Sequence, residues 1–302
     1  MSRSIFTQNT HNTDRMKRFI GRCAPVTRAM MVAIAAAWIS PNPAYPANGI
    51  VNVAPPGSVV RWPGEGLEEC GMGSATWLPM SNSCWYPIDL LVPESTIELH
   101  RTRHGERESL TITIGPYPYP EQRLTVAPEM ANPPAEQLDR IRRENSLVSA
   151  LWWSGAPPVF TLPLAPPIDP LPEFRSFGSR RVLNGEPKNP HSGVDLSAPK
   201  GTPVRAAAAG TVVLTGAHYF SGNSVFVDHG DDLVTMYFHL DRIDVAQGDP
   251  VDRGQTLGTV GSTGRATGPH LHFGIRWHGA RIDPAILLMD PESIPKTGKD
   301  PL

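Results

Sequence analysis

The distribution of proline constrains the fold of this chain more than any other feature of its sequence. The 302 residues include 33 prolines, more than average composition predicts, and most of them lie between residues 41 and 172. Proline fixes φ and has no amide hydrogen, so it interrupts helices and favours extended segments and turns. We therefore expect strands and linkers in the N-terminal half of the chain, and not a helical bundle.

Residues 48–130 have the pattern of a small β-sandwich-like domain. Short β-prone segments such as SVVRW, STIELHR and SLTITI alternate with turns that contain Gly and Pro. Cys70 and Cys84 remain as an even pair once an N-terminal signal is removed, and we expect a disulfide between them because exported proteins form such bonds. A metal or redox pair is the alternative, which the 14-residue offset does not support.

The N-terminus has the pattern of an export signal. Lys17, Arg18 and Arg22 precede an apolar run at 29–39, and small residues and prolines follow it. The run is shorter than the roughly 20 residues needed to span a bilayer. We predict a signal peptide over residues 1–47, with Met16 as an alternative start. The mature protein is then expected in the periplasm or cell envelope, or less favourably in the medium, without a transmembrane segment. An uncleaved anchor is the alternative.

Two further features limit the partners and the architecture. The formal net charge is −2, so the chain lacks the basic footprint of a nucleic-acid-binding protein. Residues 132–153 have apolar side chains at helical spacing, with proline near the start and Glu136 in the first turn. We expect a packing helix there, or alternatively a rigid arm that partly covers a cleft. Together with the proline-rich strap that follows, it forms a predicted linker at 131–173.

A second domain is predicted at 174–290, followed by a short tail at 291–302. Strand-like segments bounded by glycine predict a β-rich fold in this region. The segment 270–277 gives the clearest prediction of side-chain placement, because alternate side chains of a strand face opposite sides. One side is expected to form a core face, with Leu271, Phe273, Ile275 and Trp277. The other side carries His270 and His272.

The segment 233–240 divides in the same way. The expected apolar face has Val234, Met236, Phe238 and Leu240, and the expected polar face has Thr235, Tyr237 and His239. If this strand and the strand at 270–277 share a sheet, all three histidines of the two segments can face one cleft. Tyr237 is interpreted either as a substrate contact or as a buried cross-strand residue.

His191 and Asp195, in the string HSGVD, complete a set of five candidate site residues. Four residues of extended chain span about 13 Å, so joint ligation of one ion requires a turn or bulge, which we expect near Gly193. Imidazole nitrogens and a carboxylate oxygen suit Zn²⁺, and three protein ligands leave one position for water, as in catalytic sites. Zinc lowers the pKa of such a water to about 7. The two remaining histidines can then transfer protons and stabilise an oxyanion.

Each of these strings is weak alone, but their order and spacing are specific. HSGVD, MYFHL and GPHLHF, with the intervening GNSVFVDHG and the glycine-rich run before GPHLHF, resemble the M23 peptidases of the lysostaphin and LytM type over about residues 174–288. The resemblance implies that His191, Asp195 and His272 bind one Zn²⁺ ion and that His239 and His270 are catalytic. It also implies an open antiparallel sheet and an enzyme that cleaves peptide cross-links in peptidoglycan.

Two alternative functions remain at this stage. The first is a non-cleaving or autoinhibited LytM-type regulator that acts on a partner cell-wall hydrolase, although such family members usually lack some of the five residues. The second is a metal-binding or carbohydrate-binding module whose function lies in the aromatic side chains of the N-terminal β domain. These are Trp62, Trp77, Trp85 and Tyr86, which we otherwise interpret as core residues.

The remaining titratable residues of the C-terminal half carry weaker predictions. His218, His229 and His278 fit none of the ligand strings, and we interpret them as surface or turn histidines. Arg180 and Arg181 are interpreted as a solvated charged turn, with contact to substrate carboxylates as the alternative.

Overall fold

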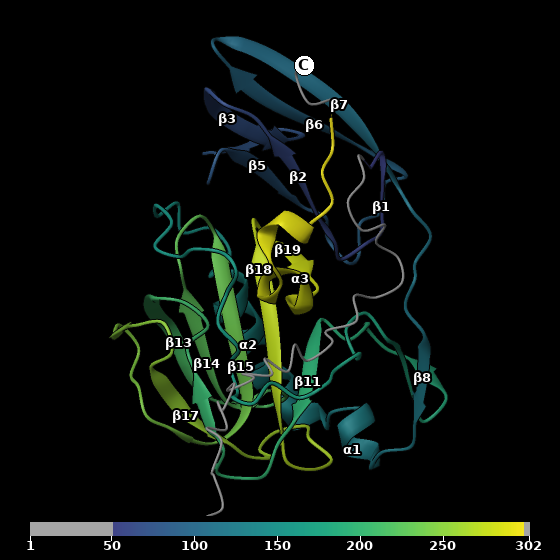
Figure 1. The fold of residues 1–302 in the computed structure, drawn as a ribbon. Helices are drawn as coiled ribbons and strands as arrows, with labels where there is room; N and C mark the ends of the chain where they lie inside the picture. The colour runs from purple at the N-terminus through teal and green to yellow at the C-terminus, as the bar shows by residue number, and fades with distance from the viewer. Residues whose placement is uncertain (1–50, 299–302) are drawn as a thin grey trace, which may run out of the picture. The chain divides into compact units, whose positions relative to one another are not determined.

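The computed structural model describes residues 51–298, and these residues are mainly β, as predicted (Figure 1). The predicted signal peptide at 1–47 lies outside the described residues. Within the described range, no helix is long and apolar enough to cross a membrane.

The N-terminal half forms two small sheets that pack on each other. One has the strand order β1-β7-β6-β3-β4 and the other pairs β2 with β5. Their buried side chains, such as Val60, Tyr86, Leu99 and Ile112, form one cluster between the sheets, which confirms the sandwich-like prediction. The strands are β1 (Val53–Ala54), β2 (Val59–Pro63), β3 (Leu67–Met72), β4 (Ala75–Trp77), β5 (Ser83–Pro87), β6 (Thr96–Arg103) and β7 (Glu106–Ile114).

The disulfide between Cys70 and Cys84 is present. Cys70 belongs to β3 and Cys84 to β5, so the bond joins the two sheets. Trp62, Trp85 and Tyr86 around it are buried, as expected for core residues.

The C-terminal half is an open antiparallel sheet with the strand order β11-β18-β15-β14-β13-β16. β17 pairs with β15 and β12, and β19 pairs with β18. The two strands with the clearest sequence pattern, β15 and β18, are neighbours in the middle of this sheet. The strands are β11 (Gly193–Ser197), β12 (Pro203–Arg205), β13 (Gly210–His218), β14 (Gly222–Asp228), β15 (Leu233–Ile243), β16 (Pro250–Val251), β17 (Thr256–Val260), β18 (His270–Trp277) and β19 (Ala280–Ile282).

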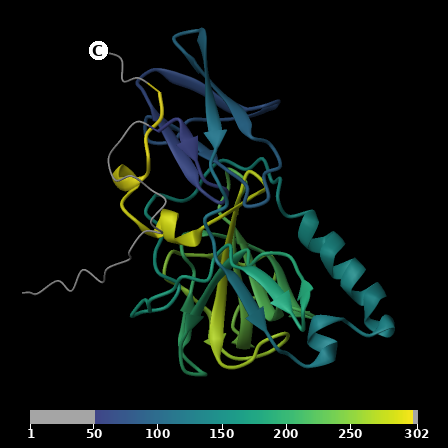
Figure 2. The same cartoon turned by 90° about the vertical axis from the view of Figure 1, so that its right-hand side faces the viewer.

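Short elements connect the two halves. The predicted helix at 132–153 is shorter than expected, because a 3-10 turn follows the two prolines and α2 begins only at Leu138. Figure 2 shows α2 beside the C-terminal sheet. A third sheet pairs β8 and β10 with β9. These elements are β8 (Glu121–Leu124), α1 (Pro128–Ala131), η1 (Ala135–Gln137), α2 (Leu138–Ser149), β9 (Arg180–Leu183) and β10 (Glu186–Pro187).

The C-terminal end packs against the N-terminal strands. After α3 (Pro284–Leu288) and η2 (Pro291–Ser293), Lys296 pairs with Arg61 of β2 in a parallel bridge. The Arg61 guanidinium also donates from Nη2 to Oε2 of Glu292 at 2.8 Å. The residues expected to form a tail therefore contribute contacts to β2, while the division of the chain into domains stays a prediction.

His229 lies in the turn between β14 and β15, but its side chain is fully buried and not at the surface. Its Nδ1 lies 2.6 Å from the carbonyl oxygen of Ala209, and its Nε2 lies 2.7 Å from Oγ1 of Thr235. Thr235 in turn contacts the buried Tyr237 hydroxyl. Burial lowers the pKa of His229 to about 4, so the folded state holds this imidazole neutral.

We therefore expect acid to destabilise the protein through His229. The unfolded chain binds a proton at an ordinary pKa near 6.5, so stability is full above that pH and falls as the pH drops toward 4. A separation of about 2.5 pH units corresponds to about 3 kcal/mol of unfolding free energy. The measurement is urea unfolding of metal-free protein at pH 7 and pH 4, beside His229→Gln. If His229→Gln loses as much unfolding free energy between pH 7 and pH 4 as the wild-type protein does, this account is contradicted.

Candidate functional site

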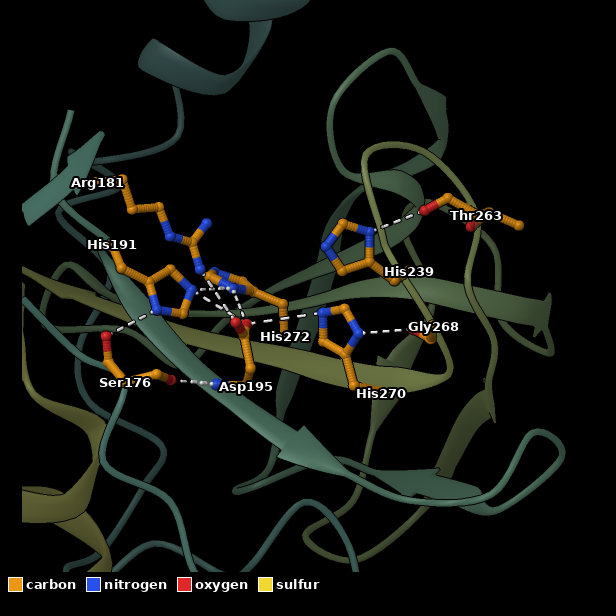
Figure 3. A network of polar contacts seen from close by, with 9 residues as sticks. All are labelled: Ser176, Arg181, His191, Asp195, His239, Thr263, Gly268, His270 and His272. Atoms are coloured by element: carbon orange, nitrogen blue, oxygen red, sulfur yellow. Dashed lines mark hydrogen bonds and ion pairs between the residues drawn. The ribbon is translucent and has the colours of Figure 1, made fainter. Parts of the chain in front are cut away.

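Three predicted ligands meet on one side of the C-terminal sheet (Figure 3). Asp195 in β11 is directly opposite His272 in β18, and His191 precedes β11. Oδ1 of Asp195 lies 3.0 Å from Nε2 of His191 and 3.0 Å from Nδ1 of His272. The two imidazole nitrogens are 2.8 Å apart. These three residues are the only group with metal-ligand spacing among residues 51–298.

The donor atoms fit a zinc ion. In a tetrahedral shell with bonds of about 2.0–2.1 Å, ligand atoms lie roughly 3.3 Å apart, close to the observed triangle. Two imidazoles and one carboxylate are also a ligand set that zinc accepts with an open fourth position. The triangle supplies three of the four ligands of a tetrahedral shell, so one position stays open. The set therefore suits a catalytic metal better than a closed structural one.

Neighbouring groups fix the orientation of these side chains. Nδ1–H of His191 donates to the carbonyl oxygen of Ser176 at 2.9 Å, which leaves Nε2 as the free nitrogen. Oγ of Ser176 accepts the backbone amide of Asp195 at 2.8 Å. The second carboxylate oxygen of Asp195 accepts from Arg181 at 3.1 Å. Residues 176 and 181 are thus parts of the site that the ligand strings do not contain.

Arg181 corrects one sequence interpretation. The sequence favours a solvated charged turn for it, but it lies in β9, is partly buried, and is paired with Asp195. Its neighbour Arg180 instead lies over the ring of Tyr117, 4.4 Å from the ring centre. Alternation along β9 separates the two arginines, and only Arg181 reaches the site.

Gly193 does not form the expected turn or bulge. It is the first residue of β11 and pairs in regular register with Gly274. His191 lies before the strand, so strand alternation does not determine which way its side chain points. A Cβ at position 193 would lie 2.6 Å from Nε2 of His272 and 2.6 Å from the carbonyl oxygen of Phe273. Glycine is therefore required for the close approach of the His272 ring and not for backbone conformation.

The alternation expected for β15 is wrong at the residues that matter most. Phe238 pairs with His272 and Tyr237 pairs with Phe273, and directly paired residues share a face. Phe238 therefore lies on the side of the site, where its ring stacks on His272 at 5.1 Å between centroids. Tyr237, expected on the polar face, is buried in the core.

His239 reaches the site because the strand alternation breaks at this residue. Its φ is 65°, and the register of β15 shifts with β14 between Tyr237 and Leu240 and with β17 between Leu240 and Arg242. Phe238 and His239 consequently lie on the same side, while Leu240 returns to the core. The ring centroid of His239 is 4.8 Å from that of His270 and 6.1 Å from that of His272.

His239 and His270 are held in the same manner. Nδ1–H of His239 donates to the carbonyl oxygen of Thr263, and Nδ1–H of His270 donates to that of Gly268, both at 2.8 Å. Each imidazole therefore has Nε2 available. In His270 this atom lies 3.7 Å from Oδ1 of Asp195, beside the candidate metal ligands (Figure 3).

The electrostatics suit ligation and proton transfer. Burial lowers the pKa of His239 to about 3, and the nearby His272 adds to this effect. Burial also lowers the pKa of His272 to about 4, against the opposing influence of Asp195. Burial raises the pKa of Asp195, but hydrogen bonds from His191 and His272 outweigh it and hold the pKa below its ordinary value. At neutral pH the site thus offers neutral imidazole and ionised carboxylate, the forms that bind metal.

Known proteins contain a segment that is similar in sequence to the part of the chain that holds this site. Residues 189–284 match the model of Peptidase family M23. The chain is 45% identical over 94 residues to the peptidoglycan DD-endopeptidase ShyA of Vibrio cholerae, which is 31% of this chain and 22% of that protein. It is 39% identical over 138 residues to ShyC of the same organism, also a peptidoglycan DD-endopeptidase, which is 45% of this chain and 31% of that protein.

One solved structure resembles most of the chain. The crystal structure of a putative peptidase M23 from Pseudomonas aeruginosa is 31% identical, covers 80% of this chain and 96% of that chain, and has a TM-score of 0.60. By contrast, the chain spans less than a third of the length of ShyA and ShyC. Because the likeness to the solved protein covers nearly all of that protein, this chain belongs to peptidase family M23.

Proposed function

We propose that this protein is an exported zinc-dependent endopeptidase that hydrolyses peptide cross-links of peptidoglycan. The observation that carries the proposal is the arrangement of five side chains. Three present donor atoms within about 3 Å of one another, and two more imidazoles beside them have Nε2 available. The names of ShyA and ShyC, both peptidoglycan DD-endopeptidases, support peptidoglycan as the substrate.

In this proposal His191, Asp195 and His272 hold one Zn²⁺ ion. When bound, the ion would polarise water and the scissile carbonyl group. Nε2 of His270 accepts a proton from the attacking water, because it lies beside the ligand triangle, and the imidazolium formed then stabilises the developing oxyanion. His239, whose ring centroid lies 4.8 Å from that of His270, takes up this proton on Nε2 in turn and passes it to the leaving amine. The carbonyl oxygens of Thr263 and Gly268 keep both imidazoles in the tautomer that this chemistry needs.

The envelope is the proposed location. A signal over residues 1–47, the disulfide and a cell-wall substrate agree with an oxidising compartment outside the cytoplasm. The proposed organisation keeps the sequence boundaries, with the peptidase domain at 174–290 preceded by the β domain and its linker.

Removing the metal is the direct test of the proposal. We expect the purified protein to release peptides from purified peptidoglycan, to lose this activity in a chelator, and to regain it when one equivalent of Zn²⁺ is restored. Mass spectrometry of the products identifies the bond that is cut. Stoichiometric zinc without any cleavage would instead favour a regulator of a partner cell-wall hydrolase, and cleavage that continues in chelator would contradict the assigned metal chemistry.

A further inference from the structure

Helix α2 lies outside the segment that matches the family, yet its polar side is attached to the turn between β13 and β14. The carboxylate of Glu144 accepts the backbone amide of Tyr219 at 2.8 Å and Nε–H of Arg140 at 2.7 Å. Arg140 also donates from Nη2 to the carbonyl oxygen of Ala217 at 2.9 Å. These contacts join the linker helix to residues 217–219.

The same turn supports the backbone of His239. The carbonyl oxygen of Ser221 accepts the amide of His239 at 2.9 Å. This residue has φ near +65°, a left-handed conformation that costs a side-chain-bearing residue about 1 kcal/mol or more and persists only where the surroundings impose it. The amide contact from Ser221 is therefore part of what keeps the imidazole of His239 on the side of the site.

Thr263 restricts the same turn from its opposite side. Oγ1 of Thr263 accepts the amide of Asn223 at 2.9 Å, and a Cβ at Gly222 would lie 2.4 Å from Thr263. The carbonyl oxygen of Thr263 holds the His239 ring. The segment 217–223 is thus enclosed between Thr263 and α2. On the side of α2, the carboxylate of Glu144 makes the contact with this segment, through the amide of Tyr219.

Apolar contacts dock α2 independently of Glu144. Trp152 packs with the buried side chains of Phe226, Val234 and Met236, and Val148 and Leu151 pack around them. The guanidinium of Arg276 also lies over Trp152 at 4.5 Å. Because these contacts remain when the Glu144 carboxylate is removed, a substitution there separates the polar link from the docking of the helix.

We propose that Glu144 is a positioning residue for His239, acting through the amide of Tyr219 and the carbonyl oxygen of Ser221. This inference rests on the proposed function, because it assigns to the linker helix a part in turnover. It places one determinant of the peptidase site about 45 residues before the matched segment. The helix expected from sequence as a packing element then has a second role, which is to hold the turn whose Ser221 carbonyl accepts the amide of His239.

The test compares Glu144→Ala with Glu144→Gln and with Glu136→Ala, an exposed glutamate just before the same helix. We expect Glu144→Ala to lower kcat about 10- to 100-fold, as small misplacements of catalytic groups do, with KM and zinc content unchanged. Glu144→Gln keeps an oxygen for the Tyr219 amide and is expected to restore most of kcat. Glu136→Ala is expected to behave as the wild-type protein.

A second measurement does not depend on activity. Hydrogen exchange of the His239 amide, followed by NMR in the zinc-loaded protein, is expected to become about tenfold faster in Glu144→Ala, as for the loss of one hydrogen bond. Unchanged exchange and unchanged kcat in Glu144→Ala would overturn the inference, as would a glutamine variant as impaired as the alanine variant. A wild-type protein without activity would defeat the proposed function alone, since the exchange result still tests the link to His239.

Discussion

Replacing His272 with alanine is expected to abolish both stoichiometric zinc binding and hydrolysis of peptidoglycan. The substitution leaves only Nε2 of His191 and Oδ1 of Asp195 from the triangle of donor atoms, and zinc sites in enzymes need three protein ligands. Loss of an outer-shell partner already costs roughly 10- to 100-fold in metal affinity, so loss of a ligand should cost more. The result should be an empty site at micromolar zinc.

The measurement is zinc content by mass spectrometry after dialysis, together with calorimetric titration and the peptidoglycan assay. His104→Asn is a matched control, because His104 is an exposed histidine in the turn between β6 and β7, with a left-handed backbone that asparagine tolerates. Asp195→Asn is a second variant, which keeps the shape of the ligand but removes its charge. One equivalent of tightly bound zinc in His272→Ala, with cleavage intact, would refute the ligand set.

Sequence alone predicted the position of His272 because β18 is a regular strand. Its core face, with Leu271, Phe273, Ile275 and Trp277, is fully buried, and simple alternation then places His270 and His272 together on the other side. The glycine-bounded strand pattern predicted only a β-rich domain, whereas the open antiparallel sheet was an implication of the resemblance to the M23 peptidases.

Alternation failed for β15 because it assumes that no residue interrupts the strand. Val234, Met236 and Phe238 are assigned by the sequence pattern to a face away from the histidines, but they lie on the side of the site. There they pack with Val148 of α2 and with Leu151 and Trp152 just after it. The expected polar residues Thr235 and Tyr237 are buried beneath the sheet. His239 lies beside His270 and His272 only because a left-handed residue at 239 reverses the pattern.

Contacts made by backbone carbonyls were beyond sequence reasoning. Thr263 and Gly268 hold imidazoles through their carbonyl oxygens, which every residue type possesses, so no side-chain pattern marks them. Ser176 and Arg181 contact the site from segments that precede the ligand strings. Only the fold determines that these segments lie beside Asp195, and short strings cannot encode that proximity.

His270→Ala is expected to retain one equivalent of zinc and to lower kcat by about 10²- to 10⁴-fold, the usual contribution of a positioned acid or base. Nε2 of His270 lies 3.7 Å from Oδ1 of Asp195, beside the ligand triangle but outside it. Metal binding should therefore survive while proton transfer is lost. Zinc content, kcat and KM on a soluble cross-linked peptide give the required separation.

The companion variant His239→Ala decides whether the two imidazoles act together. If both imidazoles serve one proton-transfer sequence, kcat of the double variant should be about that of the slower single variant. The reason is that the rate losses of residues that act as a unit do not add. Full additivity of the two losses would show that His239 and His270 act in independent steps. Loss of zinc in His270→Ala would instead move His270 into the ligand set, and the 3.7 Å separation from Asp195 would then have to shorten when the metal binds.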